Sequence, residues 1–183
     1  MNRLMIMTVG KTHSGKTTFA NELESILQEA IVIDQDNHAE FINKHYMKLR
    51  PQEGPNKLKF TVTNTIVEYA IEQSHFHIIL SNSNLHNPAR SNVLRYFYEK
   101  GFKCIIVYFD LPTEVLIERI EKTNRPKTIF RNASSYQEVL ERQEMSKPEE
   151  PSEDVVNHLF VIKDPNEISD VIQQIKTISE SSI

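Results

Sequence analysis

Eight residues near the N-terminus have the types and spacing needed to bind the phosphates of a nucleotide. Residues 10–17 read Gly-Lys-Thr-His-Ser-Gly-Lys-Thr, a complete G-x-x-x-x-G-K-[ST] pattern. Gly10 and Gly15 let the backbone wrap closely around an anion, so that successive N–H groups point inward and the following helix adds its positive end. Lys16 is expected to reach the β- and γ-phosphates, and Thr17 to offer its hydroxyl to Mg²⁺. We predict that the nucleotide contacts Gly10, Lys11, Thr12, His13, Ser14, Gly15, Lys16, Thr17 and Thr18.

The residues on either side of this loop are those that such a site requires. An apolar run at residues 4–9 predicts a strand before the loop. Apolar residues at one-face helical spacing predict a helix after it, namely Phe19, Leu23, Ile26, Leu27 and Ala30. The alternative is a glycine-rich turn followed by Lys-Thr by chance. Because the chain has only 4 glycines and two of them lie in this loop, we favour the nucleotide site.

Short apolar runs alternate with helical patterns along the rest of the chain. Strands are expected at about residues 3–9, 31–33, 76–80, 102–109 and 159–162, each a continuous apolar segment typical of a strand buried on both faces. Such alternation predicts a parallel sheet covered by helices. We therefore expect an α/β fold, a P-loop NTPase-type three-layer sandwich with a five-stranded parallel sheet and helices on both faces, plus a helical lid.

Two aspartates follow the second expected strand, at the edge where open parallel sheets bind ligands. Asp36 is the candidate catalytic base, because a phosphoryl acceptor needs a carboxylate to orient its hydroxyl and accept the proton. The alternative role for Asp36 is that of a helix N-cap. Asp34 either helps Thr17 to bind Mg²⁺ or simply ends the strand. The third strand leads into Ser81-Asn82, and the amide of Asn82 cannot supply the negative charge that a metal-binding aspartate would supply there.

The densest basic stretch of the chain lies between the fifth and sixth expected helices. It contains Arg119, Arg125, Lys127 and Arg131, and Pro126 breaks the helical pattern within it. Arginine forks match phosphate oxygens and stabilise negative charge in a transition state. We therefore predict a lid at about residues 119–135 that closes over the donor phosphates and excludes water. The alternative is a solvated, charged helix end.

Other patterns have ordinary structural interpretations. His75 and His77 are spaced for a metal pair, but no third ligand lies near them in the sequence. Cys104 lies in an expected buried strand and is read as a small core residue. Ser135 and Glu138 fit a capping box at the start of a helix.

Length and composition limit the classes of protein. With 183 residues, the chain is expected to form one domain over residues 1–183. The net charge of −4 gives no overall basic field for long nucleic acids, and no apolar stretch is long enough to cross a membrane. A single cysteine excludes an internal disulfide, and the first strand leaves no room for a signal peptide, so we expect a cytoplasmic protein. No stable protein partner is implied, and the oligomeric state stays open.

Several of these segments together resemble the kinase domain of 5′-polynucleotide kinases and, more broadly, small P-loop kinases of the AAA-like family. The resemblance covers roughly residues 3–145 and rests on residues 10–17, 33–37, 79–85, 109–112 and 118–119. It implies a five-stranded parallel sheet, ATP as donor, Mg²⁺, a hydroxyl acceptor, Asp36 as base and Arg119 as a lid arginine. The sequence differs in having Asn82 in place of an aspartate, and in lacking an arginine at residues 37–40.

The sequence thus predicts an ATP-dependent phosphotransferase. Its acceptor would be a hydroxyl of a nucleoside, a polynucleotide end or another small alcohol. The predicted catalytic residues are Lys16, Asp36, Arg119 and Arg125, and the predicted metal ligands are Thr17 and Asp34. The alternative is a nucleotide-binding regulatory protein, or a weak ATPase without an acceptor.

Overall fold

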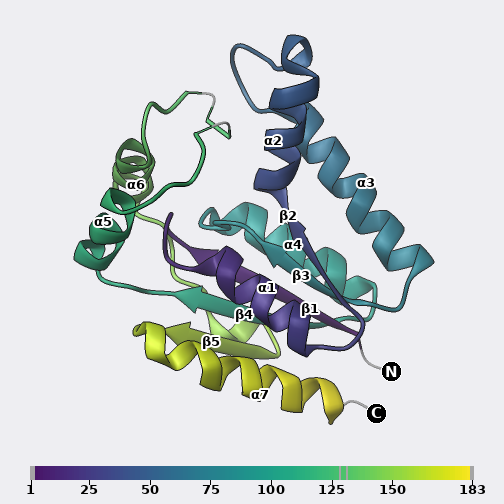
Figure 1. Ribbon diagram of the computed structural model, residues 1–183. Helices are drawn as coiled ribbons and strands as arrows, with labels where there is room; N and C mark the ends of the chain where they lie inside the picture. The colour runs from purple at the N-terminus through teal and green to yellow at the C-terminus, as the bar shows by residue number, and fades with distance from the viewer. Residues whose placement is uncertain (1–2, 128, 131, 182–183) are drawn as a thin grey trace.

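Five parallel strands form a single sheet in the order β2-β3-β1-β4-β5 (Figure 1). The computed structural model describes residues 3–127, 129–130 and 132–181. The strands are β1 Leu4–Gly10, β2 Ala30–Asp34, β3 His77–Ser81, β4 Lys103–Phe109 and β5 His158–Ile162. Each agrees with an expected strand to within a few residues, so the predicted five-stranded parallel sheet is confirmed.

The central strand of the sheet is buried along its whole length. All seven residues of β1 are buried, and β1 pairs in register with β4 from Leu4 opposite Lys103 to Gly10 opposite Phe109. A strand flanked by two others and covered on both faces has no solvated side, which explains its unbroken apolar sequence. The strand therefore holds the start of the loop, at residue 10, in a fixed position.

Helices cover both faces of the sheet, as predicted. The described residues form seven α-helices: α1 Lys16–Ile26, α2 Gln35–His45, α3 Lys57–Gln73, α4 Asn87–Glu99, α5 Thr113–Glu121, α6 Tyr136–Met145 and α7 Ile168–Glu180. Helices α1 and α7 lie on one face, and α3 and α4 lie on the other (Figure 1). Helix α7 buries Val171, Ile172 and Ile175, and each such side chain stabilises the fold by about 1.5–3 kcal/mol.

The segment predicted as a lid is a loop between two helices. Helix α5 ends at Glu121 and α6 begins at Tyr136, so Arg119 lies in the last turn of α5 while Arg125 lies beyond the helix. The described residues between the two helices contain no helical turn, which corrects the expectation of a helical lid. Pro126 accounts for this because it has no backbone N–H for a helix. Arg131 of the predicted basic stretch lies outside the described residues.

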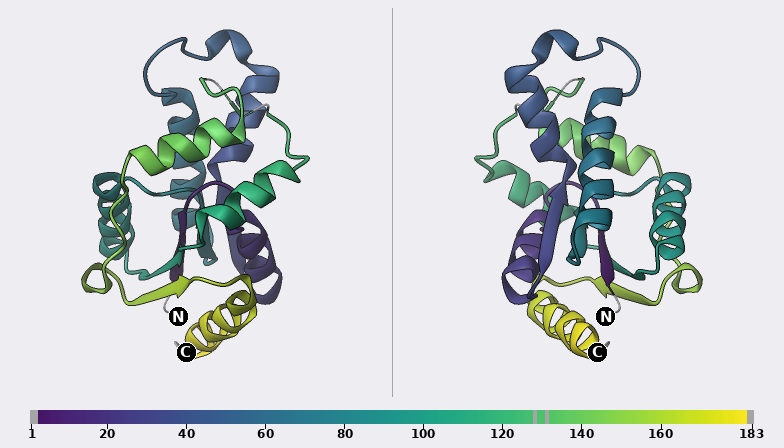
Figure 2. Two further views of the ribbon diagram at one scale, coloured as in Figure 1. Left: turned by 90° about the vertical axis from the view of Figure 1, so that its left-hand side faces the viewer. Right: turned by 90° about the vertical axis from the view of Figure 1, so that its right-hand side faces the viewer.

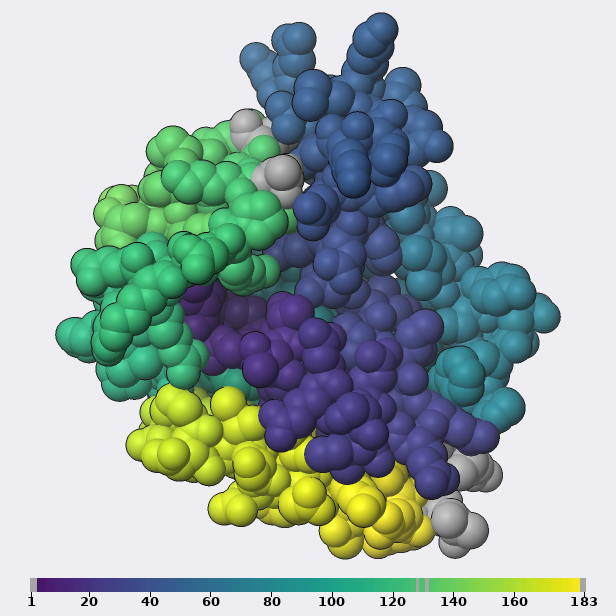
Figure 3. Space-filling view, in the orientation of Figure 1, coloured from purple at the N-terminus to yellow at the C-terminus, as the bar shows by residue number. Residues whose placement is uncertain are grey.

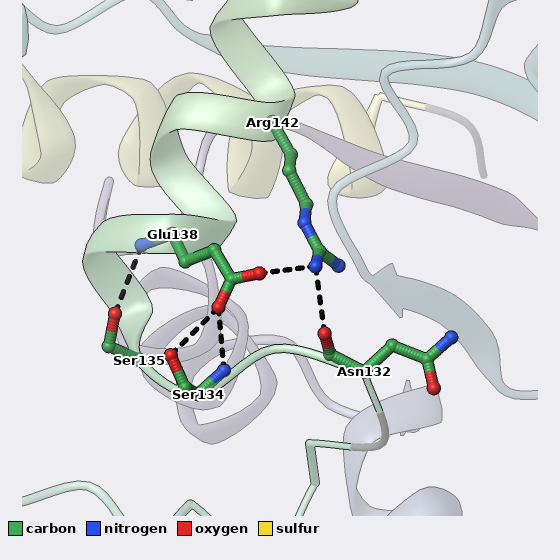
Figure 4. A network of polar contacts seen from close by, with 5 residues as sticks. All are labelled: Asn132, Ser134, Ser135, Glu138 and Arg142. Carbon is green, nitrogen blue, oxygen red and sulfur yellow. Dashed lines mark hydrogen bonds and ion pairs between the residues drawn. The ribbon is translucent and has the colours of Figure 1, made fainter.

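A network of polar contacts fixes the junction between this loop and α6 (Figure 4). Ser135 caps the helix by accepting a hydrogen bond from the backbone N–H of Glu138 at 3.2 Å. A capping box would also need the Glu138 carboxylate to accept a hydrogen bond from the backbone N–H of Ser135. Instead, the carboxylate accepts from the N–H of Ser134 at 2.7 Å. Glu138 also pairs with Arg142, which donates to the Asn132 carbonyl at 2.8 Å. The end of the loop is therefore tied to the first two turns of α6.

The loop reaches across the molecule toward α2 and the 3₁₀ turn Met47–Leu49 that follows it (Figure 2). Arg50 donates a hydrogen bond of 3.5 Å to the carbonyl of Phe130 in the loop. The loop and the α2–α3 connection thus approach each other above the carboxyl ends of the strands.

The histidines near β3 have structural roles. The buried His77 ring accepts a hydrogen bond from the backbone N–H of Leu4 at 2.9 Å, and His75 contacts Glu29 at 3.1 Å. The two side chains thus have different partners, and the described residues contain no group of three or more side chains suited to hold a metal ion. Cys104 is buried in β4, as expected. None of the described helices is long and apolar enough to span a bilayer.

Candidate active site

The loop between β1 and α1 has the backbone conformation of an anion-binding nest. Gly15 has φ +103° and His13 has φ +59°, which turns successive N–H groups toward one side. At Gly10 a Cβ atom would lie 2.9 Å from the Cβ of Phe109 and 3.0 Å from the hydroxyl of Ser14. Only glycine fits there, because the loop passes directly against β4. The first turn of α1 follows at Lys16, so the positive end of the helix faces the same space.

Lys16 lies folded within this loop. Its amino group donates to the hydroxyl of Ser14 at 3.0 Å and to the carbonyl of Lys11. Burial lowers the pKa of Lys16 to about 7; the Asp36 and Asp34 carboxylates oppose the shift, and the Arg125 charge adds to it. A lysine held in this way gains a charged partner when an anion enters the loop.

Asp34 joins the loop to the end of β2. Its side chain accepts hydrogen bonds from the Thr17 hydroxyl at 3.3 Å and from the backbone N–H of Asp36 at 2.8 Å. Burial raises the pKa of Asp34, so a cation beside this carboxylate would favour its charged form. The N-cap of α2 is Asp34, and not Asp36 as the alternative interpretation supposed. The Asp36 side chain is therefore not needed to cap the helix.

Two arginines approach the loop from the opposite side. Arg119 donates to the carbonyl of His13 at 3.0 Å, and the Arg125 guanidinium lies 5.7 Å from the centre of the Tyr136 ring. The His13 ring meets Tyr136 edge-on at 4.6 Å. Burial and the nearby Arg125, Lys16 and Arg119 charges lower the pKa of His13 to about 4. His13 is therefore neutral near pH 7, and the positive charge at this side comes from the arginines.

Helix α6 makes direct contacts with the loop. Gln143 accepts a hydrogen bond from the backbone N–H of Thr12 at 2.7 Å. Lys11 forms an ion pair with Glu144 at 3.1 Å, and the same carboxylate oxygen accepts from Thr113 at 2.6 Å. The side chain of Lys11 therefore faces α6. Only the backbone N–H of Lys11, and not its side chain, is therefore available for the predicted contact with the nucleotide.

A cavity of about 590 Å³ brings most of the predicted residues together. Figure 3 shows a hollow between the green atoms of α5 and α6 and the blue atoms of α2, with the purple N-terminal segment at its base. The predicted residues that line the cavity are Thr12, His13, Gly15, Lys16, Thr17, Thr18, Asp34, Asp36, Arg119 and Arg125. Gly10, Lys11 and Ser14 belong to the loop but do not line the cavity.

Several lining residues were not found by sequence reasoning. Phe130 and Tyr136 form an aromatic pair, with ring centres 4.6 Å apart, on the wall next to Arg125. Val139 and Gln143 follow on α6. Phe130 lies within the stretch that the sequence marked as a lid, but no spacing rule marks Gln143 as a partner of the loop. Asn82 also lines the cavity, next to Ser81 at the end of β3.

The sequence of the chain matches a known protein family. Residues 5–147 match the family described as AAA domain (AAA_33). No curated protein matches the sequence.

Solved structures with the same fold include several kinases. A candidate kinase from Chloroflexus aurantiacus matches with a TM-score of 0.70 and 14% identity, covering 97% of this chain and 98% of that chain. The APS kinase CysC of Mycobacterium tuberculosis, in complex with AMPPNP and APS, matches with a TM-score of 0.61 and 14% identity over 98% and 99% of the two chains. Shikimate kinase from Bacteroides thetaiotaomicron matches with a TM-score of 0.58 and 14% identity over 97% and 98%. The chain therefore has the fold of P-loop kinases.

Proposed function

This chain belongs to the AAA domain family, and we propose that it transfers the γ-phosphate of ATP to a hydroxyl group of a small molecule or of a nucleic-acid end. The observation that carries the proposal is the convergence of three features on one cavity. These are the phosphate-binding loop with Lys16, the Thr17–Asp34 pair, and the carboxylate of Asp36, which is not used as a helix cap. The solved structure of an APS kinase with AMPPNP supports a nucleotide in this fold.

The residues at the base of the cavity suit a triphosphate and a magnesium ion. The N–H groups of the loop and the amino group of Lys16 can donate to phosphate oxygens. The Thr17 hydroxyl and the Asp34 carboxylate are 3.3 Å apart and offer the hard oxygen donors that Mg²⁺ prefers. When bound there, Mg²⁺ would neutralise charge on the phosphates. Because Asn82 supplies no charge at the end of β3, Asp34 is the carboxylate that supports the ion.

Asp36 is placed to orient the acceptor. It lines the same cavity as Lys16 and Thr17, in the first turn of a helix whose start is fixed by Asp34. In the proposed step, the acceptor oxygen forms a bond to the γ-phosphorus as the bond to the β–γ bridging oxygen breaks. The hydroxyl proton passes to the Asp36 carboxylate, and ADP leaves.

Arg119 and Arg125 line the cavity on the other side. Their guanidinium groups can pair with phosphate oxygens and stabilise the charge that develops during transfer. Arg119 is already oriented by its bond to the His13 carbonyl, whereas Arg125 belongs to the loop that approaches α2. We propose that closure of this loop brings Arg125 onto the phosphates and excludes water, which favours transfer over hydrolysis.

The formation of ADP with and without acceptors tests the proposal. We expect wild-type protein to release ADP faster when a true acceptor is present. With the same acceptor, Lys16→Ala should release ADP at least about a hundredfold more slowly than wild type. Lys176→Ala is the matched control, since Lys176 is a half-exposed lysine on α7 whose amino group lies 3.9 Å from the Glu180 carboxylate. Equal ADP release from Lys16→Ala and wild type would refute the proposal.

A second candidate function is a nucleotide-binding regulator that hydrolyses ATP slowly. The observation that favours it is Asn82, an amide at the end of β3 where a carboxylate would assist a metal ion. The same assay separates the two candidates, because a regulator releases ADP at one rate whatever acceptor is added. The resemblance to 5′-polynucleotide kinases and the cytoplasmic location stay predictions.

A further inference from the structure

A second cavity of about 270 Å³ lies between α3 and α4, over the carboxyl ends of β2 and β3. It shares one residue, Asn82, with the cavity that holds Lys16 and Asp36. Another of its lining residues, Gln35, directly precedes Asp36 at the start of α2. We call this second cavity the amide groove. It adjoins the proposed reaction site on the side of the predicted base, away from α5 and α6.

Four side-chain amides line the amide groove without a partner among the described residues. They belong to Gln35, Asn64, Asn82 and Asn92, which come from α2, α3, the β3–α4 connection and α4. None of these amide groups forms a hydrogen bond with a described residue. A fifth amide in the groove, that of Asn84, donates to the Thr8 carbonyl at 2.9 Å. Each unpaired amide offers both an acceptor oxygen and two donor hydrogens.

Apart from Thr63 and Glu68, the remaining lining of the amide groove is apolar or aromatic. Ile33, Val67 and Phe97 are buried and form its floor, and the Tyr96 ring lies beside them. The groove has no lysine or arginine among its lining residues, and its one charged side chain is Glu68. A ligand with a phosphate or carboxylate would therefore meet no positive charge there, and it would be repelled by Glu68.

We propose that the amide groove binds the uncharged ring of the phosphate acceptor, a sugar or a nucleoside. This inference rests on the proposed function, because it assigns the acceptor class of the same reaction. Hydroxyl and amide groups of such a ring would pair with the four free amides and with Glu68, while its apolar face would lie on the floor and on Tyr96. Asn82, which lines both cavities, would lie between the bound ring and the reaction site.

Binding can be measured without turnover. The probes are uridine and D-glucose, each compared with a phosphorylated form, uridine 3′-monophosphate or glucose 6-phosphate, by saturation-transfer NMR and calorimetry. AMPPNP is present throughout, so that no probe can bind in the loop. We expect one neutral probe to bind wild type, and its phosphorylated form to bind at least about tenfold more weakly.

A double variant, Asn64→Ala with Asn92→Ala, removes two amides at exposed helical positions where alanine is well tolerated. We expect it to bind the neutral probe roughly tenfold or more weakly, because two hydrogen bonds are lost. Gln174→Ala, an exposed amide on α7, is the matched control and should bind as wild type does.

Three outcomes would overturn the assignment: neither neutral probe binds, the phosphorylated form binds as tightly as the neutral one, or the double variant binds as wild type does. AMPPNP affinity is recorded in the same samples. A failure of the probes with normal AMPPNP binding contradicts the amide groove alone, whereas loss of AMPPNP binding contradicts the proposed function.

Discussion

The pKa of Lys16 gives a quantitative prediction for nucleotide binding. In the free protein its pKa is lowered to about 7, mainly by burial. A bound phosphate would favour the charged amine and raise this pKa. Binding is therefore coupled to uptake of a proton, and the affinity is highest below pH 7 and falls as the pH rises above it.

The size of the effect follows from the fraction of Lys16 that is already charged. With a pKa of about 7, about nine-tenths of the free protein carries the proton at pH 6, and about one-tenth at pH 8. The affinity for ADP should thus decrease about tenfold between these pH values, which corresponds to about 1.4 kcal/mol. At pH 7, binding should take up about half a proton. His13 does not contribute, because its pKa is lowered to about 4.

Calorimetry in two buffers of different ionisation enthalpy measures both the affinity and the proton uptake. Lys16→Arg is the matched control, since arginine stays charged throughout this range and reports only the protons of the nucleotide itself. The reasoning is refuted if wild type and Lys16→Arg show the same dependence of affinity on pH. Asp36→Asn extends the test: it removes the strongest charge that supports protonated Lys16, so the fall in affinity should begin at a lower pH.

Two further substitutions test other parts of the structure. His77→Ala should lower the free energy of unfolding in urea by about 1–3 kcal/mol, because the buried N–H of Leu4 loses its acceptor; His77→Asn, which can accept that bond, should lose less. Equal stability of His77→Ala and wild type would contradict this role. Arg119→Ala should fold normally and lower kcat by about a hundredfold, with Arg119→Lys intermediate, because the guanidinium faces the loop beside His13. An unchanged kcat in Arg119→Ala would exclude it from the reaction.

Much of the fold is encoded by local patterns in the sequence. Continuous apolar runs mark the five strands, since the strands lie within a sheet covered on both faces. Ser135 caps the start of α6, as expected. The phosphate-binding loop is equally local, because its glycines and lysine act within eight residues. The position of each strand's end then places Asp34 and Asp36 beside the loop.

Contacts between distant segments could not be predicted in the same way. Gln143 bonds Thr12 across 131 residues, and only the packing of α6 against the loop brings them together. The N-cap is Asp34 rather than Asp36, because α2 begins two residues earlier than that alternative supposed, and sequence patterns do not define a helix start so closely. The amide groove also combines residues of several elements that have no common motif.

Transfer of label from γ-labelled ATP tests the central claim most directly. Wild type and Asp36→Asn are compared at pH 6, where most of the wild-type Lys16 is charged, against oligonucleotides, nucleosides, sugars and aminoglycosides. We predict a labelled product with wild type and transfer at least about a hundredfold slower with Asp36→Asn, although the variant still binds ATP at this pH. Full transfer by Asp36→Asn to the same acceptor would contradict the account.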